Sequence, residues 1–157
     1  DISAQDTGPL SLSTTSGSIE VASSRDTVRL SSVSGDIQVT GPLRGIHAGT
    51  SSGEISVEAA SGAVWLSSLS GDIQAGLVAP LRQCTIKSSS GSVTVEASPG
   101  LDAKLDFRTT SGEMECSLPV RLQSQSRNNL SAILGKGGAP VALQTVSGDI
   151  NLTSGGN

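Results

Sequence analysis

Three carboxylates lie 18 residues apart in this 157-residue chain, at Asp36, Glu54 and Asp72. If residues at this spacing become neighbours in the fold, the three side chains form a column of oxygen atoms suited to calcium or another hard cation. Calcium usually takes about six or more oxygens from an irregular loop, and the sequence contains no Asp-x-Asp-x-Asp run. We therefore expect a row of solvated turn charges rather than a metal site, and we expect no cofactor.

A second set with the same spacing is Arg29, His47 and Trp65, which includes the only histidine and the only tryptophan of the chain. Trp and Arg are the residue types most enriched in binding hot spots, and side chains on adjacent strands lie close enough for two rings to stack. The functional hypothesis is a contact patch for a sugar ring or a partner protein. The alternative is a tryptophan left on the surface or covered by a loop, because scattered exposed apolar residues are normal.

The two cysteines, Cys84 and Cys116, fall at positions that the repeat described below turns toward the interior. In an exported protein they could form a disulfide across a thin core, closing a loop of about 30 residues. Two buried free thiols that act as small apolar groups are the alternative.

The remaining composition argues against catalysis and against binding of nucleic acid. There is one histidine and no tyrosine, and no Gly-x-Ser-x-Gly, His-Glu-x-x-His or phosphate-binding loop is present. The net charge of −4 provides no positive surface for nucleic acid. Since no run of 18 apolar residues occurs, the chain could be tethered to a membrane only through a segment outside it.

The spacing of all these residues comes from a repeat of Ser-Gly, a polar residue and an apolar residue. Successive glycines of the repeat are 18, 18, 18, 20, 21 and 36 residues apart, the last being two steps of 18. Such self-similarity indicates a repeat architecture. The first four residues resemble the tail of another copy, so we expect the chain to begin within a repeat. The copies are residues 16–19, 34–37, 52–55, 70–73, 90–93, 111–114 and 147–150.

Each copy carries two short runs of alternating apolar residues, which predict β-strands rather than helices. We number positions from zero at the apolar residue after Ser-Gly-acid. Positions −9, −7, 0 and +2 are then expected to face the core, together with position −4 at a narrow corner. The hydroxyl residues at −5 and −3 would form an outward strip, as on ice-binding solenoids. Position −8 points to solvent, in the column Ser11, Arg29, His47, Trp65, Thr85 and Asp106.

These features predict an all-β, single-domain parallel β-solenoid over residues 1–157, with about eight coils. One coil has too little apolar surface to fold alone, whereas stacked coils bury a continuous column. Ile37, Ile55 and Ile73 should therefore stack in adjacent coils. The motif fades near residues 117–139, where we expect one degenerate coil.

The Ser-Gly-[Asp/Glu]-Ile-x-Val repeat resembles the bacterial family of putative adhesins, domains of unknown function in cell-envelope proteins. The resemblance covers essentially the whole chain, including the Gly-Lys-Gly-Gly before the last copy. It implies a right-handed parallel β-solenoid that is exported or membrane-tethered, without demonstrated catalysis. We therefore expect an extracytoplasmic structural or adhesive module for a protein, a polysaccharide or a neighbouring copy. A ligand-sensing domain of a membrane-anchored envelope regulator is the alternative, and a carbohydrate-active enzyme is a more distant one.

Overall fold

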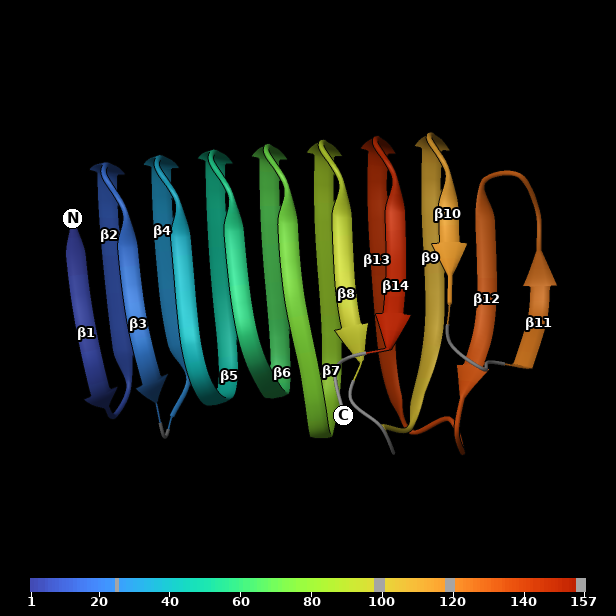
Figure 1. The fold of residues 1–157 in the computed structure, drawn as a ribbon, viewed down its shortest axis with the longest axis horizontal. Helices are drawn as coiled ribbons and strands as arrows, with labels where there is room; N and C mark the ends of the chain where they lie inside the picture. The colour runs from blue at the N-terminus through green and yellow to red at the C-terminus, as the bar shows by residue number, and fades with distance from the viewer. Residues whose placement is uncertain (25, 98–100, 118–120, 155–157) are drawn as a thin grey trace.

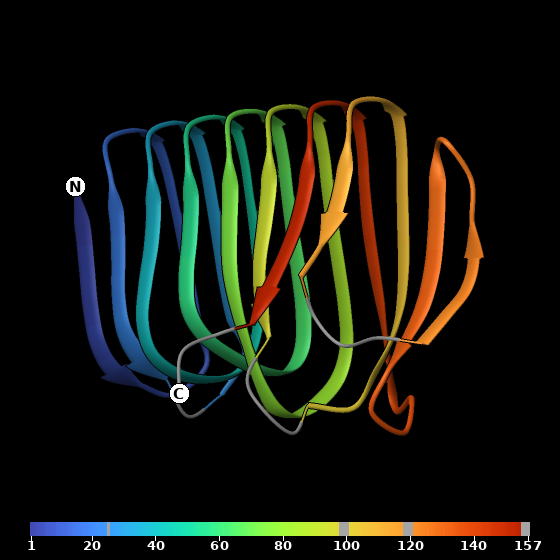
Figure 2. The same cartoon turned by 45° about the vertical axis from the view of Figure 1, so that its right-hand side comes forward.

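The computed structural model describes residues 1–24, 26–97, 101–117 and 121–154. These residues form one sheet that winds into a flattened β-solenoid (Figures 1 and 2). No helix among them is long and apolar enough to cross a membrane. The strands are β1 (Ile2–Thr7), β2 (Leu10–Ser16), β3 (Ile19–Ser24), β4 (Val28–Ser34), β5 (Ile37–Ser52), β6 (Ile55–Ser70), β7 (Ile73–Ser90), β8 (Val93–Ala97), β9 (Ala103–Ser111), β10 (Met114–Cys116), β11 (Arg121–Gln125), β12 (Asn129–Leu134), β13 (Ala139–Ser147) and β14 (Ile150–Ser154).

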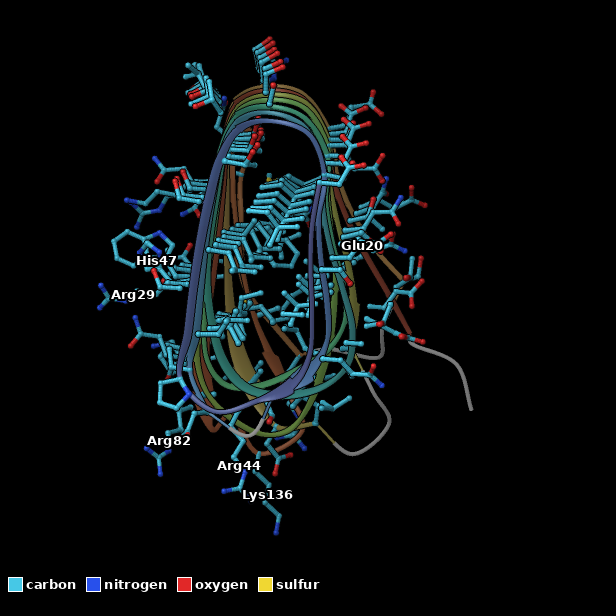
Figure 3. All side chains as sticks on the ribbon, turned by 90° about the vertical axis from the view of Figure 1, so that its left-hand side faces the viewer. Glu20, Arg29, Arg44, His47, Arg82 and Lys136 are labelled. Carbon is cyan, nitrogen blue, oxygen red and sulfur yellow. The ribbon has the colours of Figure 1, made fainter. Side chains whose placement is uncertain are left out.

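The solenoid has two walls, which the end-on view of Figure 3 shows as the long sides of an oval. The Trp65 wall consists of β2, β4, β13, β9 and the C-terminal parts of β5, β6 and β7. The Glu20 wall consists of β1, β3, β8, β14, β10 and the N-terminal parts of β5, β6 and β7. The Ser-Gly motif turns the chain tightly from the first wall to the second.

The core lies between the walls and follows the predicted apolar positions. Ile37 pairs with Ile55, and Ile55 pairs with Ile73, and all three side chains are fully buried. The stacked isoleucines confirm the predicted register at position zero. They also explain why a short coil folds only in an array, since each isoleucine is covered by the coils on both sides.

The glycine of the motif is required by the close approach of successive coils at the turn. Gly53 has a φ of 146°, and a Cβ atom on it would lie within 3.0 Å of the carbonyl oxygen of Gly35. Gly71 meets the carbonyl of Gly53 in the same way. A side chain at these positions would therefore be strained by both the backbone conformation and the space.

The order of the coils differs from the sequential stacking that we expected. Strand β13 pairs with β7 on one side and with β9 on the other, and β14 lies between β8 and β10. Figure 1 shows this as a red coil inserted between yellow-green and gold ones. The last copy of the repeat is therefore internal, and its strand β13 pairs with β7 and β9 at the same repeat positions that the earlier coils use.

The described residues between 117 and 139 do not form the degenerate coil that the sequence suggested. Strands β11 and β12 form an antiparallel hairpin, and β12 runs antiparallel to β9. Leu130, Ala132 and Leu134 of β12 are buried, and Leu130 pairs with Phe107. The hairpin covers the edge of β9 and so closes this end of the solenoid (Figure 2). Its alternating residues fit either strand direction, which is why the pattern was ambiguous.

The prediction that position −4 points inward is wrong. The prediction that the hydroxyl residues at −5 belong to an outward strip is wrong as well. Thr50 and Ser68 at position −5 are buried, whereas Val33 and Leu69 at position −4 are 52% and 60% exposed. The wall strands remain extended up to the turn, so the inward alternation of −9 and −7 continues to −5. A column of small hydroxyl residues therefore lies inside the solenoid.

Candidate functional site

The fold brings Arg29, His47 and Trp65 together on the outside of the Trp65 wall. They come from β4, β5 and β6, and they are paired partners in the parallel register. Their chain neighbours at −9 and −7 are buried, so alternation directs these three side chains outward. Arg29 and His47 lie side by side beyond the ribbon in Figure 3. The three residues therefore lie in one outward column on neighbouring strands.

The two rings form an edge-to-face pair. The ring centroids of His47 and Trp65 are 4.4 Å apart with an interplanar angle of 67°, a favoured arrangement for aromatic side chains. Trp65 is nevertheless 48% exposed. One side of the indole is therefore fixed by the imidazole, while the rest remains open to a ligand.

A surface groove of about 420 Å³ follows these rings. It is hollowed because Ala63, beside Trp65 in the same strand, has only a methyl group and lies opposite Gly45 on the neighbouring strand. On the other side of the indole, the groove is lined by Gln83, Thr85 and Lys87 of β7. Gln83 and Lys87 were not singled out from the sequence. They lie at positions −10 and −6, which are two residues on either side of −8 and therefore face outward like it. The alternation of the strand could have identified them.

The predicted column does not continue from Thr85 to Asp106. Because β13 is inserted, Ala142 pairs with both of them and separates them by one strand. Asp106 instead lies 3.4 Å from Arg108, measured between Oδ2 and Nη2. The groove therefore ends without a carboxylate at this side.

The predicted carboxylate column lies at the tight turns, away from the groove, and its aspartates link successive coils. Asp36 Oδ1 accepts a hydrogen bond from the backbone N–H of Glu54 at 3.0 Å, and Asp72 Oδ1 accepts one from Ser92 N–H at 2.9 Å. In the described ranges, no group of three or more His, Cys, Asp or Glu side chains could hold a metal ion. The aspartates therefore have a structural explanation, namely to satisfy turn amides of the next coil.

Cys84 and Cys116, for which the sequence left a disulfide and two free thiols as alternatives, are both free cysteines in the structure. Cys84 in β7 and Cys116 in β10 belong to coils that are separated by β13 and β14. The sequence suggested a separation of one rung, and the inserted coil makes it two. Burial in the apolar core raises the pKa of the Cys84 thiol to about 12.

The geometry defines a parallel β-solenoid repeat domain with an aromatic groove on one wall. The chain belongs to the Toastrack DUF4097 family, whose model matches residues 47–153. Among solved structures, it is similar to a putative cell adhesion protein from Clostridium sporogenes ATCC 15579, with 10% identity over 96% of this chain and 93% of the other, and a TM-score of 0.47. The comparison with curated proteins yields no match.

Proposed function

We propose that this chain is a non-catalytic, extracytoplasmic adhesive module that holds a polysaccharide in the groove of the Trp65 wall. The observation that carries the proposal is the half-exposed Trp65, fixed against His47 in an open groove on a rigid sheet. The resemblance of the Ser-Gly repeats to envelope adhesins favours a location outside the cytoplasm. Trp65, His47 and Arg29 are the proposed contact residues.

The chemistry of the groove suits a sugar ring. One face of a pyranose presents mainly C–H groups, and its burial against the indole of Trp65 removes apolar surface of both partners from water. The ring hydroxyls at its rim require donors and acceptors. Gln83 and Thr85 line the groove beside the indole, and their side chains can both donate and accept hydrogen bonds.

The backbone around the groove lowers the cost of binding. Strands β5 and β6 are each paired on both sides over this wall, so a ligand would meet side chains on a backbone that is already ordered. Association then loses less conformational entropy than it would with a mobile loop. A rigid groove of this kind suits the repeated units of a polymer.

The same lining does not suit catalysis of glycosidic cleavage. Most glycoside hydrolases place two carboxylates on either side of the scissile bond. Among the residues that the structure describes, the groove is lined by one imidazole and by no Asp or Glu. Binding without turnover is therefore the activity that this groove supports best.

A glycan array probed with the intact domain and with the Trp65→Ala variant tests the proposal. We expect the unmodified chain to bind at least one class of polysaccharide and the variant to lose that binding at unchanged thermal stability. Leu69→Ala, which removes an exposed apolar side chain at a tight turn away from the groove, is the matched control and should bind normally. Iodide should quench Trp65 fluorescence, and a bound ligand should protect it. Binding that survives Trp65→Ala would contradict the proposed site.

A further inference from the structure

The groove is flanked by cations, and its described lining contains no anion. Arg29 lines it on the strand before His47, and Lys87 lines it on the strand after Trp65. The described residues of its lining include no Asp or Glu. Among the described residues, neither Arg29 nor Lys87 forms a salt bridge. Both positive charges therefore remain available to a ligand.

This local charge belongs to a separation of charge between the two walls. Among the described residues, the outward side chains of the Trp65 wall include four cations and one carboxylate, which gives a net charge of +3. The described outward side chains of the Glu20 wall include four carboxylates and no Lys or Arg, which gives a net charge of −4. Figure 3 shows Arg29 and Glu20 on opposite sides of the oval. The charged residues are Arg29, Lys87, Lys104, Arg108 and Asp106 on the first wall, and Glu20, Glu58, Glu96 and Glu115 on the second.

The opposite wall also carries a groove, which is useful as an internal comparison. It has a volume of about 350 Å³, and its described lining includes Glu58 and Glu96 but no cation or aromatic ring. The protein as a whole has a net charge of −4, and the Glu20 wall would repel an anionic polymer. The Trp65 groove is where such a polymer would be attracted.

The spacing along the solenoid axis indicates an extended ligand. Arg29 and Lys87 lie on β4 and β7, three strand steps apart, which corresponds to about 14 Å at the usual strand spacing. Trp65 lies between them, one step from Lys87. A chain that crosses the strands could place one ring face on the indole and an acidic group at each end of the groove.

Resting on the proposed function, we infer that the ligand of the Trp65 groove is an anionic polysaccharide that carries carboxylates, such as a uronic acid polymer. Arg29 and Lys87 bind the carboxylates through charge-assisted hydrogen bonds, and Trp65 packs on a ring between them. A nucleic acid fits less well, because it carries a charge at every nucleotide while the groove offers two permanent cations.

Calorimetric titration with oligogalacturonate, and with the same oligomer after methyl esterification of its carboxylates, tests the inference. We expect the free acid to bind, and we expect the affinity of the methyl ester to be lower by a factor of about ten or more. Arg29→Gln combined with Lys87→Gln should abolish this preference. Lys104→Gln combined with Arg108→Gln removes the same charge from the same wall outside the groove, and should leave the preference intact.

The outcomes separate the inference from the proposed function. Equal binding of acid and ester that depends on Trp65 overturns the anionic class and retains the polysaccharide site. Equal losses in the two double variants would show attraction to the wall as a whole and would also overturn the inference. A single-stranded oligonucleotide that binds as tightly as oligogalacturonate would overturn it in favour of nucleic acid. If neither form of the oligomer binds and a wider glycan array shows no binding either, the proposed function itself fails.

Discussion

The first five Ser-Gly copies of the chain and its C-terminal third use the same repeat in different ways. Through β8, each coil stacks on the one before it. After β8, the chain leaves one rung open, builds β9 and β10, adds the β11–β12 hairpin and returns to fill the open rung with β13 and β14. The repeat therefore specifies the geometry of a rung but not its place in the stack.

The return of the chain has visible local causes. Gly135 and Gly137 adopt φ values of 66° and 73°, which allow a tight reversal after β12. Strand β12 before them runs antiparallel to β9 and brings the chain back to the correct end of the open rung. Leu143 of β13 then pairs with Ile86 and Phe107. Val141, Leu143, Ile150 and Leu152 of the late coil therefore each have a partner on both sides.

The sharpest test of this difference compares isoleucines at position zero. Ile150 pairs with Val93 and Met114 and is fully buried, as is Ile55. We expect Ile150→Ala and Ile55→Ala each to lower the free energy of unfolding by about 2–5 kcal/mol. Ile2→Ala should lower the free energy of unfolding by less, because Ile2 is only half-buried in β1 at the N-terminal end. Urea denaturation measures all three variants, and an effect of Ile150→Ala no larger than that of Ile2→Ala would contradict the inserted coil.

A second test uses the thiol at the junction of the two regions. The Cys84 pKa is raised from 9.0 to about 12 by desolvation, and β13 covers it on the C-terminal side. The folded state holds the thiol proton of Cys84 more tightly than the unfolded state does. The stabilisation that this difference provides is therefore complete below pH 9 and is lost as the pH rises toward 12, at about 1.4 kcal/mol per pH unit. The free energy of unfolding as a function of pH should show this loss.

The Cys84→Ala variant is the control, and its stability should depend less on pH across the same range. Cys116, which is less buried, should react with a thiol reagent in the native state before Cys84 does. After denaturation without reductant, two free thiols should be counted. Rapid native reaction of Cys84 would mean that the inserted coil does not cover it.

The smallest expected effect concerns the buried hydroxyl column. Thr50 Oγ1 is buried without a hydrogen-bond partner in the described structure, whereas Thr109 Oγ1, next to the inserted coil, lies 3.5 Å from the carbonyl oxygen of Gly148. Thr50→Val should therefore be neutral or stabilise by up to about 1 kcal/mol, and Thr109→Val should cost about 0.5 kcal/mol. Thermal unfolding compares the pair. A clear destabilisation by Thr50→Val would show that the hydroxyls bond to one another along the axis.

Much of the candidate site could be predicted from the spacing alone. Arg29, His47 and Trp65 are 18 residues apart and lie between inward residues, so the repeat and the alternation placed them in one outward column. Lys87 completes the groove, but it lies in a copy in which the spacing lengthens to 20 residues and at a different outward position. Its closeness to Trp65 depends on the pairing of β6 with β7.

The corner at the tight turn was predicted less well, for a local reason. Alternation in the wall strands gave −9 and −7 correctly, but the sequence does not mark where the strand ends and the turn begins. Ser32 and Thr50 are small and polar, which is typical of exposed positions, yet both are buried. Position −5 keeps the inward parity of −9 and −7 because the wall strands stay extended up to the turn, and this geometry outweighs the polarity of the side chains.

The sequence by itself determined the elements of this protein: short strands, an inward apolar column, a glycine turn and an outward column that contains the only tryptophan. These follow from alternation and from backbone sterics, which act between residues close in the chain. Only the tertiary structure decided the order of the coils, the antiparallel hairpin and the separation of Cys84 from Cys116. Backbone pairing between rungs is nearly the same for every copy of the repeat, so the order depends on which edges the connecting segments can reach and cover.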